Sequence, residues 1–127
     1  MRLRVDPKSG PIFEQIVAGV KAAIARGELA PGEKLPSARA LAEELKVNPN
    51  TVIRAFLELE REGITETRRG LGTYVREDVN REAIRRELLL AAARRYLNAA
   101  RELGLSPEEA AQALLEVERD ARGKEPA

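Results

Sequence analysis

Two helix-capping signals lie close together in the middle of the chain, and they constrain the fold more than any other feature. Ser37 is a preferred N-cap residue, and Asn48 followed by Pro49 marks a second helix start. Apolar residues recur at three- and four-residue intervals after each start: Leu41, Ala42 and Leu45, then Val52, Ala55, Phe56 and Leu59. Because only Lys46 and Val47 separate the two patterns, the sequence predicts two helices packed across a tight turn.

The residues before this pair predict three simpler elements. Residues 3–5 alternate and indicate a short strand or an extended arm. Residues 12–24 carry one apolar stripe, which predicts a helix that starts after Pro11 and that Gly27 ends. Residues 34–36 follow a Pro-Gly turn and are expected to be extended.

A hairpin follows the third predicted helix, which Gly63 is placed to end. Residues 64–67 and 73–76 alternate as two strands, and the segment 68–72 between them is cationic and rich in glycine. Helix, extended piece, helix, turn, helix and hairpin is the order of elements in a winged helix-turn-helix.

The remainder of the chain predicts two helices. The first runs from about Asn80 to Gly104, and a capping box that begins at Ser106 starts the second. Gly123–Ala127 is expected to be a frayed tail. The predicted fold class is therefore α+β, mainly α: a winged helix-turn-helix at residues 1–78, followed by a two-helix C-terminal dimerisation hairpin at 79–127.

The absence of cysteine and histidine excludes several functions. Disulfides, Cys/His zinc sites and nucleophile–histidine triads cannot form. We therefore expect no catalytic activity, no metal site and no cofactor. No apolar run approaches the roughly 18 residues of a membrane span, and the N-terminus lacks the apolar middle of a signal peptide. The expectation is a cytoplasmic protein without a membrane partner.

The net charge of +1 does not by itself favour a nucleic-acid partner, so a DNA-binding prediction depends on where the charges lie. The start of the third predicted helix is the part that reaches base edges, and Asn suits adenine there as Arg suits guanine. The predicted DNA-binding residues lie at the starts of the two middle helices and on the hairpin: Ser37, Arg39, Asn48, Asn50, Thr51, Arg54, Arg68, Arg69, Gly70 and Gly72. The expected partner is double-stranded operator DNA.

Each of these assignments has a simpler alternative. Asn50 and Arg54 are also compatible with solvated helix surface, and Arg39 with an ion pair to Glu43 four residues on. The hairpin arginines are compatible with a solubilising tip. The glycines do not favour a phosphate loop, because such loops run from a strand into a helix. The candidate contacts all fall around one docking surface, and this conjunction favours DNA.

Residues 10–76 resemble the N-terminal DNA-binding domain of the GntR family of bacterial repressors. The resemblance is carried by the stretches 11–16 (PIFEQI), 27–32 (GELAPG), 35–42 (LPSARALA), 48–52 (NPNTV), 59–63 (LEREG) and 68–75 (RRGLGTYV). It implies that Arg39, polar residues of the third helix and the wing glycine contact operator DNA.

Pro49 and Ile53 depart from the commonest pattern of the family, in which many members carry arginine at both positions. Those contacts do not carry over, and Asn50, Thr51 and Arg54 are expected to replace them. For Ile53 two alternatives stay open: exposure, with packing on a thymine methyl or sugar, or burial against the wing or the first helix.

The short C-terminal region resembles that of the YtrA subfamily, whose small helical tail mainly dimerises. Two helices cannot enclose a ligand cavity of about 300 Å³, and their apolar stripes need a partner, for which a second copy is the simplest choice. The predicted dimerisation residues are Ile84, Leu88, Ala92, Tyr96, Leu103, Leu114 and Val117. The alternative is that these helices pack onto the winged domain of their own subunit.

The expected function is a sequence-specific transcription regulator, a dimeric repressor that binds an inverted-repeat operator. The resemblance implies a nearby operon as its target, such as one encoding a transporter. The alternative is a winged-helix module that binds another protein without touching DNA. A small-molecule effector is left open, and the sequence names no residue for it.

Overall fold

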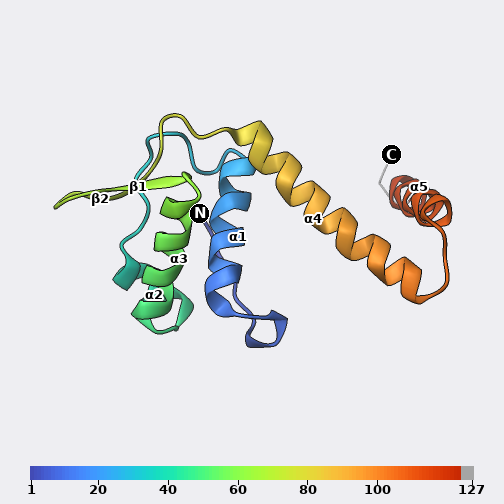
Figure 1. The fold of residues 1–127 in the computed structure, drawn as a ribbon, viewed down its shortest axis with the longest axis horizontal. Helices are drawn as coiled ribbons and strands as arrows, with labels where there is room; N and C mark the ends of the chain where they lie inside the picture. Colours follow the sequence, from blue (N-terminus) through green and yellow to red (C-terminus); the bar gives the residue numbers. More distant parts are fainter. Residues whose placement is uncertain (124–127) are drawn as a thin grey trace. The chain divides into compact units, whose positions relative to one another are not determined.

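The structure is a computed structural model that describes residues 1–123, which form two compact units that divide between Arg85 and Arg86 (Figure 1). The elements of the first unit are η1 (Pro7–Ser9), α1 (Ile12–Ala25), α2 (Ala38–Leu45), α3 (Pro49–Arg61), β1 (Thr65–Arg68) and β2 (Gly72–Val75). The helix α4 (Arg81–Glu102) begins in the first unit, and α5 (Pro107–Gly123) belongs to the second. The winged helix-turn-helix prediction is confirmed. Within residues 1–123, every helix is too short or too polar to span a membrane.

The core of the first unit is built from branched aliphatic side chains of α1, α2, α3 and the wing. The fully buried large residues are Ile16, Val20, Ile24, Leu35, Leu41, Val52, Leu59 and Val75. All of them except Leu35 and Val75 are inward positions of the predicted helical stripes, so the periodicity correctly identified the buried faces of the three helices. Leu45 and Phe56, also predicted inward, are only half-buried.

The N-terminal arm lies against α1. Residues 3–5 form no strand, so of the two alternatives the extended arm is correct. Gly19 makes the contact possible, because a Cβ there would lie 2.5 Å from the Leu3 Cδ2 atom. The Gln15 side chain binds the turn that follows, accepting from the Asp6 N–H at 2.8 Å and donating to the Gly10 carbonyl at 3.0 Å.

The helix-turn-helix forms for the local reasons that the sequence indicates. The Ser37 hydroxyl accepts a hydrogen bond from the Ala40 N–H at 3.0 Å and begins α2. Lys46 ends α2 in the left-handed region at φ 58°, an uncommon conformation for a residue with a side chain. The Asn48 Oδ1 atom accepts from the Asn50 N–H at 2.8 Å and begins α3. The chain therefore passes from one helix to the next within three residues, Lys46–Asn48.

The wing is a two-stranded antiparallel sheet, in which Thr65 lies opposite Val75 and Arg68 opposite Gly72. Both strands are shifted by one residue from the predicted ranges, so Arg68 and Gly72 belong to strands and the turn consists of residues 69–71. The Leu71 N–H closes this turn on the Arg68 carbonyl at 2.9 Å.

The predicted extended piece lies beside β2. The Leu35 N–H donates to the Thr73 carbonyl and the Val75 N–H donates to the Glu33 carbonyl, both at 2.8 Å. These bonds join the segment between α1 and α2 to the wing. They support the hairpin, because a two-stranded hairpin by itself is only marginally stable.

Two features tie the beginning of α4 to the first unit: a hydrogen bond from Arg81 and the burial of Ile84. The Arg81 Nε atom donates to the Ala25 carbonyl at 2.9 Å, at the end of α1, and the Ile84 side chain is buried. The first compact unit runs to Arg85, and the functional domain boundary after residue 78 stays a prediction.

In the second unit, α4 and α5 are joined through Tyr96, whose hydroxyl donates to the Ala110 carbonyl at 2.8 Å. The predicted capping box at Ser106 and Glu109 is present, with both of its hydrogen bonds at 3.1 Å. Leu103 lies beyond the end of α4. Of the predicted tail, Gly123 belongs to α5, and residues 124–127 lie outside the described part of the chain.

Candidate nucleic-acid interface

The starts of α2 and α3 carry the predicted contact residues, and both lack acidic side chains in the first turn. This is unlike the other three α-helices of the described chain: α1 has Glu14, α4 has Glu82, and α5 has Glu108 and Glu109. Acidic residues normally favour this position because they oppose the positive end of the helix dipole. At α2 and α3 the positive potential is not compensated locally, so these two helix starts are suited to an anionic partner.

The outer face of α3 is formed by residues opposite its buried stripe. Asn50, Ile53, Arg54 and Leu57 are all exposed. Ile53 is 46% exposed, so the alternative of burial against the wing or α1 is wrong. The side-chain amide of Asn50 makes no hydrogen bond within residues 1–123 and is open to an external partner.

Arg54 is held by an aromatic ring from α1. Its guanidinium carbon lies 3.7 Å from the centroid of the Phe13 ring. Stacking occupies the face of the planar guanidinium and leaves the N–H groups at its edge, which form no ion pair in the described chain. The side chain therefore keeps its donors for an external acceptor.

Arg39 lies in the first turn of α2 and is exposed. The alternative ion pair with Glu43 does not form, and the described residues provide Arg39 with no other partner. Ser37 and Asn48 use their side-chain oxygens as helix caps. Thr51 is half-buried. Of the residues predicted at the helix starts, Arg39, Asn50 and Arg54 thus have the most available polar groups.

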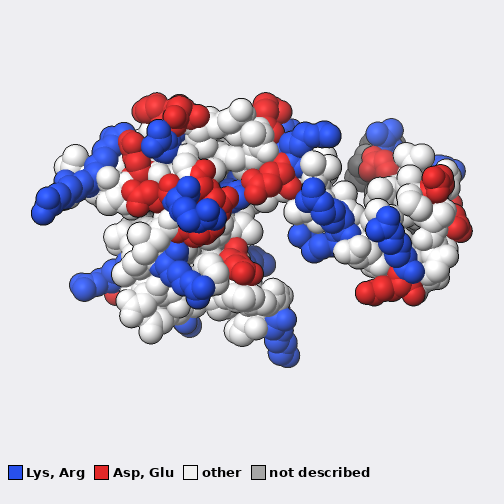
Figure 2. All heavy atoms as spheres, viewed as in Figure 1, with Lys and Arg blue, Asp and Glu red and all other residues white. Residues whose placement is uncertain are grey.

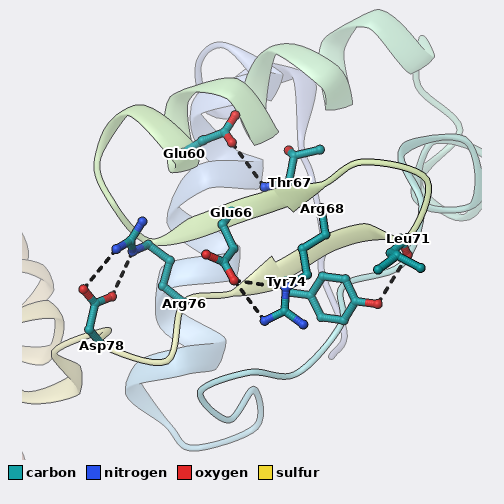
Figure 3. A network of polar contacts seen from close by, with 8 residues as sticks. All are labelled: Glu60, Glu66, Thr67, Arg68, Leu71, Tyr74, Arg76 and Asp78. Atoms are coloured by element: carbon teal, nitrogen blue, oxygen red, sulfur yellow. Dashed lines mark hydrogen bonds and ion pairs between the residues drawn. The ribbon is translucent and has the colours of Figure 1, made fainter.

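The two predicted contact arginines of the wing, Arg68 and Arg69, differ in their surroundings. The Arg68 Nη2 atom donates to Glu66 at 2.9 Å, and its guanidinium carbon lies 4.1 Å from the centroid of the Tyr74 ring (Figure 3). Arg69, in the turn, is exposed and has no such partner among residues 1–123. The charge of Arg68 is offset within the wing, whereas the charge of Arg69 is available.

Lys34 is a wing cation that the sequence interpretation missed. Its backbone forms an isolated antiparallel β-bridge with Tyr74. Its side chain lies close to Gly72, because a Cβ atom added at that glycine would be only 2.8 Å from the Lys34 Cε atom. The exposed lysine makes no ion pair with the described residues. Its position in an extended piece was predicted from the sequence, but the sequence carried no signal that this piece pairs with β2. Figure 2 shows Lys and Arg side chains gathered over the hairpin.

The nearby carboxylates are mostly engaged by arginines. Hydrogen bonds from Arg61 and Arg76 lower the pKa of Glu58 and of Asp78, respectively. Glu60 accepts a hydrogen bond from the Thr67 N–H at 3.2 Å (Figure 3). These acids lie in the C-terminal part of α3 and after β2, whereas residues 49–57 contain no acidic residue at all.

A partly buried ion pair joins α1 to the residue after α3, and sequence reasoning missed it. The Lys21 Nζ atom lies 2.7 Å from the Glu62 Oε1 atom, and the Lys21 side chain is only 6% exposed. Lysine is rarely buried without such a partner. The pair joins the C-terminal half of α1 to the end of α3, so its role is structural.

Comparison with known proteins agrees with this geometry. Residues 12–75 match the model of the family described as bacterial regulatory proteins, gntR family. The chain belongs to the GntR family. Its members are transcription regulators. The family model covers α1, α2, α3 and the two strands of the wing, which are the elements that carry the candidate interface.

Individual relatives extend the match. The HTH-type transcriptional repressor YtrA of Bacillus subtilis is 52% identical over 77 residues, which span 60% of this chain and 59% of that protein. The uncharacterised regulator YhcF of the same organism is 43% identical over 106 residues, covering 80% of this chain and 84% of its own length. A GntR family transcriptional regulator from Listeria monocytogenes has a TM-score of 0.78 at 34% identity, covering 88% of this chain and 98% of that one.

Proposed function

We propose that this regulator is a dimeric repressor that binds an inverted-repeat DNA operator through α3, the start of α2 and the wing. The observation that carries the proposal is the outer face of α3, where the donors of Asn50 and Arg54 have no hydrogen-bond acceptor among residues 1–123 and the stretch 49–57 has no acidic residue. A major groove about 12 Å wide admits such a helix and offers adenine and guanine edges to these two side chains.

The wing and α2 supply the contacts that position the protein. Arg39 at the start of α2 and Arg69 at the hairpin turn are exposed cations with no intramolecular partner among residues 1–123. Lys34 adds a third. Phosphate contacts of this kind set register and orientation, and they make affinity depend on salt. Gly70 and Gly72 have positive φ angles of 76° and 119°, so larger residues there would strain the tip.

Dimerisation is assigned to the helices at 79–127, with residues 1–78 as the DNA-binding domain. The predicted seam is not uniformly available: Ile84 is buried and Tyr96 is bonded to α5, whereas Leu88 is half-buried and Ala92 exposed. The second unit also exposes large apolar side chains, namely Leu89, Leu90, Leu103, Leu105, Leu114, Leu115 and Val117. Apolar surface of this extent favours a protein partner, and a second copy is the simplest.

The name of YtrA, a repressor, supports repression as the outcome of binding. Because the matched segment spans only 59% of that protein, repression of a particular operon stays part of the proposal.

The test is selection of bound duplexes from a random library, followed by anisotropy titration of the enriched sequence. We expect an inverted repeat and, for Arg54→Ala, roughly 10-fold or more weaker binding, since paired hydrogen bonds to a base contribute about 1–3 kcal/mol. Arg101→Ala is the matched control, because it removes an equal charge from the last turn of α4. Its affinity for the duplex should equal that of the wild type. Sedimentation should give twice the monomer mass. Failure to enrich any duplex would instead favour a protein-binding module.

A further inference from the structure

The exposed apolar side chains of the first unit are concentrated on the proposed DNA-binding elements. Its exposed large hydrophobic residues are Ile53 and Leu57, both on α3, and Leu71 in the wing turn. Leu57 is 60% exposed and lies four residues after Ile53, so the two are neighbours on the outer face of the helix. Single exposed apolar residues need no explanation, but a pair on the helix that reads DNA has a chemical use.

The occupant of this apolar pair is indicated by the charge around it. Arg54 lies between the two residues in sequence, its donors free of intramolecular ion pairs within the described chain. The stretch 49–57 has no acidic residue, and Lys46 stands exposed in the turn before it. An apolar patch within a positive surface suits an apolar group that is carried by a polyanion. In the major groove of DNA, that group is the C5-methyl of thymine.

We propose that Ile53 and Leu57 read thymine methyl groups in the operator half-site. The inference rests on the proposed function and extends it, because it adds apolar contacts from Ile53 and Leu57 to the polar contacts proposed for α3. Side chains four residues apart are separated by about 6 Å along a helix. With base pairs stacked every ~3.4 Å, this separation corresponds to two thymines about two base-pair steps apart when α3 lies along the groove.

The test uses the full chain and the enriched duplex. Each thymine of the half-site is replaced in turn by uracil, which removes the methyl group and leaves the hydrogen-bonding edges unchanged. Dissociation constants are measured for the wild type, Ile53→Ala and Leu57→Ala, with uracil in a flanking base pair as the control. Both side chains are exposed, so alanine should leave the melting temperature unchanged, and a thermal scan verifies it.

We expect one uracil substitution to weaken wild-type binding about fourfold, the effect of one buried methyl group, and a second to do the same. Ile53→Ala should lose affinity for the thymine duplex and show no further loss with uracil at its own position. Leu57→Ala should likewise lose affinity for the thymine duplex and show no further loss with uracil at the thymine that Leu57 contacts. Unchanged affinity at every uracil, or equal uracil losses in wild type and variants, would overturn the inference while leaving operator binding intact. If no duplex is enriched at all, both proposals fail.

Discussion

The Arg54 guanidinium lies over the Phe13 ring, with 3.7 Å between the guanidinium carbon and the ring centroid. The contact joins the outer face of α3 to the first turn of α1, residues far apart in sequence. Because the ring holds the flat face of the guanidinium, the side chain is oriented before DNA arrives. Less conformational entropy is then lost when its N–H groups bind a base or phosphate.

The stack predicts that Phe13 acts on DNA binding through Arg54. Phe13→Leu keeps apolar packing but removes the ring, and exposed cation–π contacts contribute about 0.5–1 kcal/mol. We expect operator affinity to fall roughly two- to fivefold, measured by anisotropy. Phe13→Tyr keeps the ring and should bind like the wild type. If Phe13→Leu weakens an Arg54→Ala background by the same factor, the ring does not act through Arg54.

The wing predicts different salt dependences for its two arginines. Arg69 has no intramolecular partner within residues 1–123, whereas Arg68 is paired with Glu66. Each phosphate contact contributes about 0.9 to the slope of log affinity against log salt. Arg69→Ala should therefore reduce the slope by about one, and Arg68→Ala should reduce it less. Titrations across a salt series check this, and equal reductions in both variants would contradict the assignment.

Thr65 predicts a stabilising substitution in the first strand. Its side chain is 1% exposed, and the hydroxyl oxygen has no hydrogen-bond partner in the described chain. An unsatisfied buried hydroxyl costs about 1–3 kcal/mol. Thr65→Val keeps the β-branched shape and should raise the free energy of unfolding by about 1 kcal/mol, as measured by urea denaturation.

Thr67, an exposed residue two positions further along the same strand, provides the control. Thr67→Val removes a hydroxyl that faces water, so stability should change by less than about 0.5 kcal/mol. A loss of stability in Thr65→Val would mean that its hydroxyl is satisfied in solution.

The ion pairs predict stability that is flat near neutral pH and falls in acid. The pKa of each of three carboxyl groups within residues 1–123 is lowered by a hydrogen bond from an arginine: Glu28 by Arg26, Glu58 by Arg61 and Asp78 by Arg76. A lowered folded-state pKa contributes stability that is fully present above the unfolded value of about 4 and is lost as pH falls through the folded value. Without histidine, no side chain titrates normally between about pH 5.5 and 8.

Melting temperatures measured from pH 2 to pH 8 check this expectation. We expect a plateau above about pH 5 and a decline below about pH 4. Asp78→Asn removes one of the three groups and should make the acid decline shallower, with Asn80 left intact as the cap of α4. An acid decline of unchanged steepness in the variant would show that this pair does not contribute.

Much of the fold was predictable because its signals are local. Ser37, Asn48 and Ser106 are capping residues whose partners lie two or three positions away, and each forms the predicted hydrogen bond. The buried faces follow from periodicity in the same way. The strand boundaries lie one residue from the predicted ranges, and no local pattern reveals that the segment 33–35 pairs with β2.

For the candidate DNA-binding site as well, some features follow from local sequence and others from tertiary packing. Sequence alone determined which residue types stand at the helix starts and on the wing, since caps, glycines and apolar spacing act over a few residues. Only the tertiary structure decided which of them have free polar groups: it stacks Arg54 on Phe13, engages Arg68 with Glu66 and Tyr74, and leaves Ile53 exposed. These outcomes depend on how α1, α3 and the wing pack together, because side chains distant in sequence meet only when the core beneath them is formed.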